Sequence, residues 1–319
     1  MRPKILIFEW IIGGGLRWQD DAHGSMDLYR QAQKMWRALC MGFEKAGFHV
    51  VTVVDRGEVF RNPSGDLRIS TTYVGDKMEV KSSLVDLANQ ADFLLLVAPE
   101  IDGCLEKCLG WVEEFRPKWL NPSLELTRIA SNKNELFHFF ASKNVGLPQG
   151  CSAIHWNDFF SQQSRENVVI KPVDGCGGEG IRLVVRSDLE TMAKISPEQL
   201  GKFRIEECVS GISASTLVMR SNWETTIFPP LQQEFIDGRF GNFLNCQNSL
   251  CKDHSLRATN LTRRVLDSLP KFTGIIGVDM VIGEDEEYLI EVNPRAVMSV
   301  DYFWQNAPEI LVDGLKLFR

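Results

Sequence analysis

Residues 288–295 combine side chains that bind cations with the pattern of a β-strand. Read with a period of two, Leu289, Glu291 and Asn293 face one way, and the two residues between them face the other. Arg295 follows directly after a proline that ends the strand. A carboxylate and an amide on one strand face, followed by an arginine, indicate a ligand site and not a core strand.

A second strand precedes this one and begins near Gly277. A symmetric hairpin whose loop centres on Asp285 pairs Asp279 with Glu291. It also places Asn293 opposite Gly277, where a glycine leaves room for a bulky group. Two carboxylates at one cross-strand position repel each other. A hard cation bound by Asp279, Glu291 and Asn293 would explain the pattern; the alternative is a solvent-facing hairpin with scattered acids.

Lys133 is the first of two candidate phosphate ligands. Ser131 or Asn132 caps a helix predicted to run to about Asn144, so Lys133 lies in the first turn, where the helix dipole disfavours a cation. Lys133 is therefore either a solvated surface residue or a ligand for a phosphate beside the helix N-terminus.

Lys171 is the second candidate and shares a strand face with Val169 in an apolar strand. A charge in such a strand is rarely left unpaired. A glycine-rich hairpin tip follows over residues 175–180, and its backbone could approach an anion closely. A flexible hairpin end is the alternative. The glycines of interest are Gly175, Gly177 and Gly178.

Composition restricts the class of protein. The chain has 319 residues, 44% hydrophobic and 24% charged, as expected for a soluble globular enzyme. Its net charge of -7 argues against a nucleic-acid or anionic-membrane partner. No apolar run reaches the roughly 18 residues of a membrane span. The eight cysteines match neither a zinc site nor a dense disulfide framework, so we expect a cytoplasmic protein.

The order of elements predicts an α/β fold. Strands and helices alternate over roughly the first 110 residues, which favours a small open parallel sheet. The glycines at positions 13–15 lack the G-x-G-x-x-G spacing, so a loop near a substrate crevice is favoured over nicotinamide binding. A turn at residues 121–123 separates a domain over 1–120 from one over 121–319. The second domain divides into lobes at 121–203 and 204–319.

Five features follow one another in a fixed order: Lys133, Lys171 with its glycine-rich tip, a strand at 203–209, Asp279, and the run from Glu291 to Arg295. This series resembles the ATP-grasp superfamily from residue 121 to near the C-terminus. The preceding segment resembles the Rossmann-like pre-ATP-grasp domain that accompanies it. The resemblance implies a two-lobed grasp domain that binds ATP with Mg²⁺, which Mn²⁺ could replace.

The same resemblance implies roles in nucleotide binding. Lys133 and Lys171 would hold the α- and β-phosphates, and the loop with Gly175, Gly177 and Gly178 would close over them. Glu206 would accept a hydrogen bond from the adenine amine. The backbone of Glu207 and Val209 would complete the adenine edge.

It also implies the residues of the reaction. Asp279, Glu291 and Asn293 would hold one or two magnesium ions, and Arg295, together with Lys171, would stabilise the transferred phosphoryl group. A ribose-binding acid is often found where this chain has Ser213, so the ribose contact is not assigned.

A finer resemblance is to the branch that contains tyramine–glutamate ligase of methanofuran biosynthesis. It is carried by Phe8-Glu9-Trp10, by the three glycines that follow, and by Ser131-Asn132-Lys133. After Arg295 the branch has a Thr-Thr-Ser-Tyr-like run, of which this chain keeps only Ser299. We therefore expect Glu9 and Ser299 to lie near the acceptor.

The resulting prediction is an ATP-dependent carboxylate–amine ligase that forms an amide through an acyl phosphate. Its partners would be a small-molecule carboxylate and a small-molecule amine, and a homodimer is compatible with this activity. The alternatives are a non-catalytic ATP-binding regulatory protein of the same fold and an ATP-grasp phosphotransferase.

Overall fold

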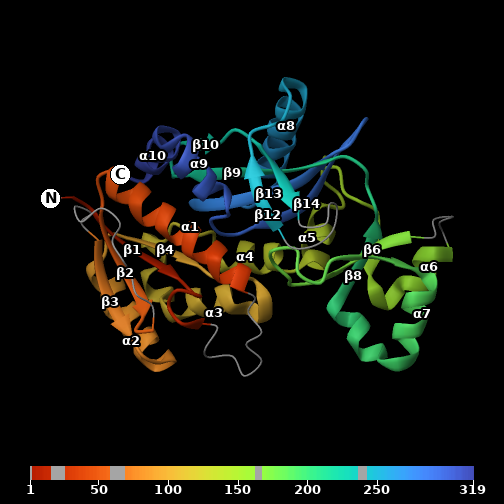
Figure 1. Ribbon diagram of the computed structural model, residues 1–319, viewed down its shortest axis with the longest axis horizontal. Helices are drawn as coiled ribbons and strands as arrows, with labels where there is room; N and C mark the ends of the chain where they lie inside the picture. Colours follow the sequence, from red (N-terminus) through yellow and green to blue (C-terminus); the bar gives the residue numbers. More distant parts are fainter. Residues whose placement is uncertain (1, 16–25, 58–68, 162–166, 236–242) are drawn as a thin grey trace.

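The computed structural model describes residues 2–15, 26–57, 69–161, 167–235 and 243–319. Figure 1 shows three parts: a sheet with β1 to β4 on one side, a small lobe with α6 and α7 on the other, and a larger lobe with β13 and β14 between and above them. Parallel and antiparallel sheets with covering helices make up the α/β fold that the sequence predicts.

The N-terminal sheet is parallel, with its described strands in the order β3-β2-β1-β4. Its central strands are continuous apolar runs, as expected for a parallel sheet that is covered on both faces. The sequence pattern predicted β1, β2 and β4 but not β3, which is half polar. The elements are β1 (Lys4–Glu9), α1 (Met26–Lys45), β2 (His49–Asp55), β3 (Ile69–Val74), α2 (Lys77–Gln90), β4 (Phe93–Val97) and α3 (Cys104–Trp111).

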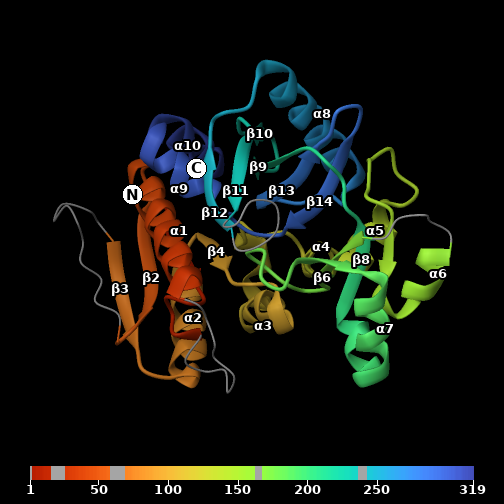
Figure 2. The same cartoon turned by 45° about the vertical axis from the view of Figure 1, so that its right-hand side comes forward.

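The small lobe is built on an antiparallel sheet in the order β5-β8-β6-β7 and has its own apolar cluster around Ile170 and Ile205. Figure 2 shows its α7 and β8 set apart from the N-terminal sheet. The elements of this stretch are α4 (Leu124–Ser131), α5 (Lys133–Phe140), β5 (Gly150–Ser152), α6 (Trp156–Ser161), β6 (Asn167–Pro172), β7 (Arg182–Val185), α7 (Arg186–Ile195) and β8 (Phe203–Glu207).

The larger lobe carries a sheet in the order β12-β11-β9-β13-β14, with β10 paired to β9. Helix α8 packs against the sheet on the side opposite to α9. The elements are β9 (Ile212–Arg220), β10 (Thr225–Ile227), β11 (Leu231–Phe235), β12 (Phe243–Gln247), α8 (Lys252–Ser268), β13 (Gly274–Ile282), β14 (Glu287–Asn293), α9 (Ser299–Asn306) and α10 (Pro308–Leu315).

The β13–β14 hairpin has the predicted pairs at its far end, where Asp279 lies opposite Glu291 and Gly277 opposite Asn293. Nearer the turn the register differs by one residue, because a bulge interrupts the pairing between Asp279 and Met280. The strict alternation predicted for β14 is therefore wrong between the bulge and the turn. Leu289 packs in the core, and Ile290 shares the site face with Glu291.

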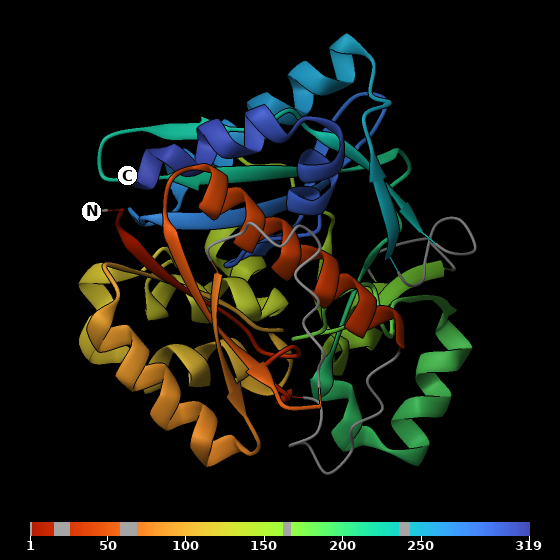
Figure 3. The same cartoon turned by 60° about the vertical axis from the view of Figure 1, so that its left-hand side comes forward.

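One hydrophobic cluster joins the N-terminal sheet to the end of the chain. It includes Ile5 of β1 and Trp36 of α1, together with Phe303 of α9 and Leu311 of α10. Helix α1 packs along α9 and α10, as Figure 3 shows. The domain boundary near residue 120 stays a prediction, since this core includes residues from both sides of it. None of the described helices is both long and apolar enough to cross a membrane.

Candidate active site

A cavity of about 410 Å³ lies where the three parts meet. Its walls include residues from the carboxyl end of β1, from β6 and β8, and from β13 and β14. Most of the residues singled out in the sequence line it, and Lys133 and Gly175 lie just behind the wall. The predicted residues in the wall are Glu9, Lys171, Gly177, Gly178, Glu206, Glu207, Val209, Asp279, Glu291, Asn293, Arg295 and Ser299.

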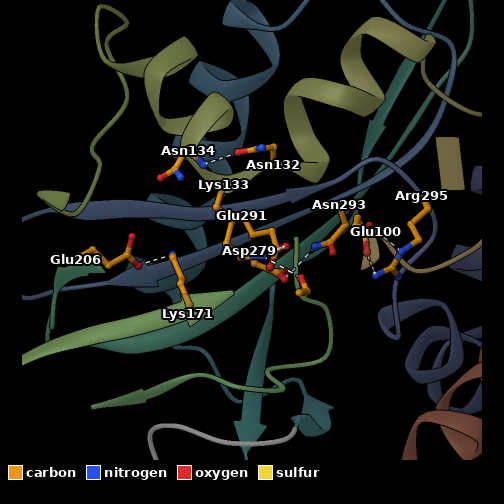
Figure 4. Close-up of polar contacts among 11 residues, drawn as sticks. Glu100, Asn132, Lys133, Asn134, Lys171, Glu206, Asp279, Glu291, Asn293 and Arg295 are labelled. Atoms are coloured by element: carbon orange, nitrogen blue, oxygen red, sulfur yellow. Dashed lines mark hydrogen bonds and ion pairs between the residues drawn. The ribbon is translucent and has the colours of Figure 1, made fainter. Parts of the chain in front are cut away.

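Asp279 and Glu291 meet across the hairpin, but each has its own partners (Figure 4). The Ser215 hydroxyl donates to Asp279 Oδ1 at 2.6 Å, and Asn293 Nδ2 donates to Asp279 Oδ2 at 3.0 Å. Burial, followed by the charge of Glu291, raises the pKa of Asp279 to about 6. A cation beside this pair would stabilise the ionised Asp279 against both its burial and the charge of Glu291.

Lys133 is the partner of Glu291. Its Nζ donates to Glu291 Oε1 and to the carbonyl of Gly175, both at 2.9 Å. Burial alone would lower the pKa of this lysine, but the Glu291 carboxylate raises it above its usual value. Only 3% of the side chain is exposed, so the solvated alternative is wrong. Asn132 is the helix cap, and the helix ends at Phe140, earlier than predicted.

Lys171 forms a buried ion pair with Glu206 (Figure 4). Arg204 Nε donates to the other oxygen of Glu206 at 3.1 Å. The Phe137 ring lies 4.0 Å from the Arg204 guanidinium and 5.0 Å from Lys171 Nζ, so it contacts both cations. Burial lowers the pKa of Lys171, and the Glu206 charge opposes this. The charge within this apolar strand is therefore paired, as the sequence pattern predicts.

The glycine-rich tip contacts two other parts of the molecule. Gly177 and Gly178 have φ values of +65° and +80°, which favour glycine. The carbonyl of Gly177 accepts a hydrogen bond from the Phe243 N–H at 3.1 Å, and Asp174 Oδ2 accepts one from the Asp102 N–H at 3.0 Å. The loop thus lies over the cavity, where its backbone could reach an anion.

The strand end at Glu207 and Val209 forms another wall of the cavity. The Glu207 N–H donates to the Gln149 carbonyl at 2.8 Å, and the Glu207 carboxylate accepts from the Gln149 N–H at 3.0 Å. A purine contact at Glu207 would therefore use its carbonyl oxygen and not its N–H.

Arg295 is held by a residue that sequence reasoning missed. Glu100 follows β4 and is 2% exposed. It accepts two hydrogen bonds from Arg295, from Nε at 2.9 Å and from Nη2 at 2.8 Å (Figure 4). Burial would lower the pKa of Arg295, but the Glu100 carboxylate raises it above its ordinary value. Glu100 could have been suspected as a carboxylate at the carboxyl end of an apolar strand.

Glu9 closes β1 and is 2% exposed. Its Oε2 accepts from the Ile12 N–H at 2.7 Å, so it stabilises the turn that leads into the three glycines. It also lines the cavity, so the expected place near the acceptor stays a prediction. Burial raises the pKa of Glu9 to about 8, which the Ile12 N–H and the charge of Arg295 oppose.

Ser299 is the first residue of α9 and is 1% exposed. The residue lines the cavity, and its buried Oγ has no hydrogen-bond partner among the described residues. Val297 fills the space beside Gly277, because a Cβ on Gly277 would come within 2.5 Å of Val297 Cγ1. The bulky group expected above Asn293 is therefore Val297.

The residues at the hairpin fit a small hard cation such as Mg²⁺. They offer two carboxylates and one amide oxygen, and Mg²⁺ in proteins usually has one or two carboxylates together with substrate phosphates and water. Within the described ranges, no three His, Cys, Asp or Glu side chains gather as a metal cluster. The remaining ligands would therefore come from a bound phosphate chain or from water.

Arg204, Phe137 and Ser215 were also missed by the sequence reasoning. Arg204 on β8 pairs with Lys171 on the neighbouring strand β6. Ser215 on β9 pairs in the same way with Asp279 on β13. These relations depend on which strands pair, and no short-range pattern gave that pairing.

The chain matches two family models. Residues 130–299 match the model of an ATP-grasp domain, and residues 49–125 match that of a pre-ATP-grasp domain. Among curated proteins, the tyramine–L-glutamate ligase of Methanocaldococcus fervens is 25% identical over 71% of this chain and 67% of its own. That of Methanocaldococcus jannaschii is 26% identical over 70% of this chain and 62% of its own. These matches span about two thirds of those relatives.

A solved structure has a similar fold. An ATP-grasp superfamily protein from Archaeoglobus fulgidus superposes with a TM-score of 0.67 over 98% of this chain and 88% of its own, at 17% identity. At that identity the likeness concerns the fold alone.

Proposed function

The chain belongs to the ATP-grasp family, and on that premise we propose that it is an ATP-dependent carboxylate–amine ligase. The observation that carries this proposal is one cavity whose walls combine a carboxylate pair, buried lysines, a glycine-rich loop and a buried arginine. These are the groups that phosphoryl transfer needs, because its catalysis is mostly positioning and charge neutralisation.

The nucleotide would lie between the small lobe and the larger lobe. Lys133 and Lys171 would bind its phosphates after exchanging their present carboxylate partners, and Gly177 and Gly178 would offer backbone N–H groups. Glu206, released from Lys171, would accept from the adenine amine. The carbonyl of Glu207 and the backbone of Val209 would complete the edge.

Asp279, Glu291 and Asn293 would hold Mg²⁺ at the phosphate end. The metal would neutralise phosphate charge and polarise the transferred group. Ser215 would keep Asp279 oriented through its 2.6 Å hydrogen bond.

The γ-phosphoryl group would pass to a carboxylate oxygen of the first substrate, giving ADP and an acyl phosphate. The amine nitrogen would then displace phosphate, giving an amide, inorganic phosphate and a proton. Arg295 would stabilise the charge on the transferred group. Glu9 and Ser299 would lie on the acceptor side, where a carboxylate can pair with an ammonium group.

The curated relatives are named for joining tyramine to L-glutamate. We propose the same class for this chain: an amino acid that supplies a carboxylate and a primary amine that accepts it. These two compounds are the first pair to test.

The test is ADP release with Mg-ATP, over a matrix of amino acids and amines. We expect ADP only when one acid and one amine are both present, with the amide found by mass spectrometry. ADP formation without an amine would favour the phosphotransferase. Tight nucleotide binding without turnover on any pair would favour the regulatory protein.

The proposed setting is the cytoplasm, where ATP is available, and the absence of a membrane-spanning helix in the described residues agrees with it. A homodimer belongs to the same proposal. Light scattering of the purified chain would report its mass in solution.

A further inference from the structure

Glu100 and Arg295 form a buried contact between two parts of the chain that are 195 residues apart in sequence. Glu100 follows β4 at the carboxyl end of the N-terminal sheet, and Arg295 follows β14 at the metal end of the larger lobe. Their side chains are 2% and 12% exposed. Two parallel hydrogen bonds fix the plane of the guanidinium as well as its position.

Little else restrains the Arg295 guanidinium. Its Nη1 donates to the Ala296 carbonyl at 3.2 Å, a contact with the next residue of the chain. Within the part of the chain that the structure describes, Glu100 is the only carboxylate in ion-pair contact with it. Glu9 and Glu291 line the same cavity and also attract it.

The turn that carries Glu100 is itself anchored. Asp102 has φ +52°, in the left-handed region, and its N–H donates to Asp174 at the base of the glycine-rich tip. An aspartate tolerates this conformation better than most residues do. The turn thus contacts both the loop over the cavity and the arginine in its wall.

We infer that Glu100 is a positioning residue that keeps Arg295 directed at the acceptor region and away from the metal ligand Glu291. This inference rests on the proposed function. Without the second carboxylate oxygen, the guanidinium would lose one of its two fixed bonds and turn toward the other carboxylates of the cavity. Glu100 would act on the reaction only through Arg295.

The first experiment compares three variants in amine-dependent ADP release. Glu100→Gln keeps the shape but offers an amide NH₂ to one guanidinium N–H, so we expect kcat to fall about 100-fold. The KM for ATP should stay within about threefold, since Glu100 is not in the cavity wall. Glu100→Asp retains two oxygens and should recover most of the loss. Asp102→Asn is the matched control on the same turn and should leave kcat unchanged.

A double-mutant cycle tests whether Glu100 acts through Arg295. In an Arg295→Lys background, which keeps the charge but not the fork, Glu100→Gln should lower kcat less than about threefold. A full 100-fold loss in that background would overturn the inference. So would an equal loss in Asp102→Asn, because the turn and not the carboxylate would then be responsible.

A readout independent of turnover separates this inference from the ligase proposal. In arginine labelled with ¹⁵N, a buried guanidinium held by two bonds should give a sharp Nε–H signal with slow hydrogen exchange. That signal, assigned through its loss in Arg295→Lys, should broaden or exchange at least about tenfold faster in Glu100→Gln. An unchanged signal would overturn the positioning role. If wild type shows the signal but forms no amide, only the ligase proposal fails.

Discussion

The two ends of the cavity carry opposite balances of charge. At the metal end, the carboxylates Asp279 and Glu291 face one cation, Lys133. At the adenine end, one carboxylate, Glu206, lies between the cations Lys171 and Arg204. The first end therefore lacks a cation, and the second lacks an anion. We propose that Mg²⁺ would supply the first and that the nucleotide phosphates bound by Lys171 would supply the second, which is a reason for the two to bind together.

The two ends also differ in how the chain builds them. The two carboxylates of the metal end come from one hairpin, so their pairing lies within a short stretch of sequence, although Lys133 reaches them from α5. The adenine end needs β6, β8 and the Phe137 ring of α5, which come together only in the fold. A change at the metal end should therefore affect chemistry more than stability, and a change at the adenine end should affect both.

The largest expected effect is on turnover in Asp279→Asn. Removing this proposed metal ligand should lower kcat on the order of 1,000-fold. The free energy of unfolding should not fall, because the substitution removes a buried charge that lies beside Glu291. ADP release at saturating Mg²⁺ and urea unfolding measure the two quantities. A loss of less than about tenfold would falsify the metal assignment.

Glu291→Ala provides the contrast at the same end. Turnover should be lost here too, but Lys133 would remain buried without its carboxylate. The free energy of unfolding should therefore fall by about 3 kcal/mol. Repulsion between the two acids alone would make either removal stabilising, but the loss of the Lys133 contact outweighs this for Glu291. Equal stability of the two variants would contradict the charge balance described for this end.

Glu206→Gln tests the adenine end. Two buried cations would lose their carboxylate, and the free energy of unfolding should fall by about 3 to 5 kcal/mol. The kcat/KM for ATP should fall about 100-fold, mainly through KM. Isothermal calorimetry with Mg-ADP checks the binding loss directly. If the variant is stable and binds nucleotide normally, the adenine end of the cavity does not couple stability to binding, and the difference from the metal end is contradicted.

Glu9→Gln concerns the acceptor side and gives a smaller effect. We expect the KM for the amine to rise about tenfold while that for ATP hardly changes. Above pH 8 the Glu9 carboxylate is ionised and can attract an ammonium group. The neutral amide of the variant cannot, although it can still accept from the Ile12 N–H. If both constants stay unchanged, Glu9 only stabilises the glycine turn.

The same variant should change how stability depends on pH. The pKa of Glu9 is about 8 in the fold, against an ordinary value of 4.5 for a glutamate in water, so the folded state binds the proton more tightly than the unfolded chain does. Its contribution to stability is complete below pH 4.5 and is lost as the pH rises through 8. Wild type should therefore lose stability relative to Glu9→Gln across that window. Urea unfolding of both proteins at a series of pH values measures the difference, and parallel curves would contradict it.

The smallest expected effect is on Cys176, within the glycine-rich tip. Burial raises the pKa of its thiol to about 12, so it should react at least about tenfold more slowly with a thiol reagent than the exposed Cys251. Mg-ATP should slow Cys176 a further few-fold and leave Cys251 unchanged. Absence of protection at saturation would place the loop away from the phosphates.

The predicted pair of Asp279 and Glu291 is present because a bulge offsets a turn whose register differs by one residue from the predicted one. The bulge near Ile290 could not be predicted, because it depends on how Leu289 fits the core. The roles of Glu100 and Arg204 could not be predicted either, although the place of Glu100 after an apolar strand could have singled it out. Glu100 acquires its role from Arg295, which follows β14, and Arg204 acquires its role beside Lys171 on β6. Long-range packing brings these parts of the chain together.

The order of synthesis gives the shared core a further consequence. Ile5 and Trp36 are made well before Phe303 and Leu311, which pack in the same cluster. The face of α1 that packs on α9 and α10 therefore stays uncovered until those two helices have emerged. Until then the growing chain presents an apolar surface that a chaperone for nascent chains could cover.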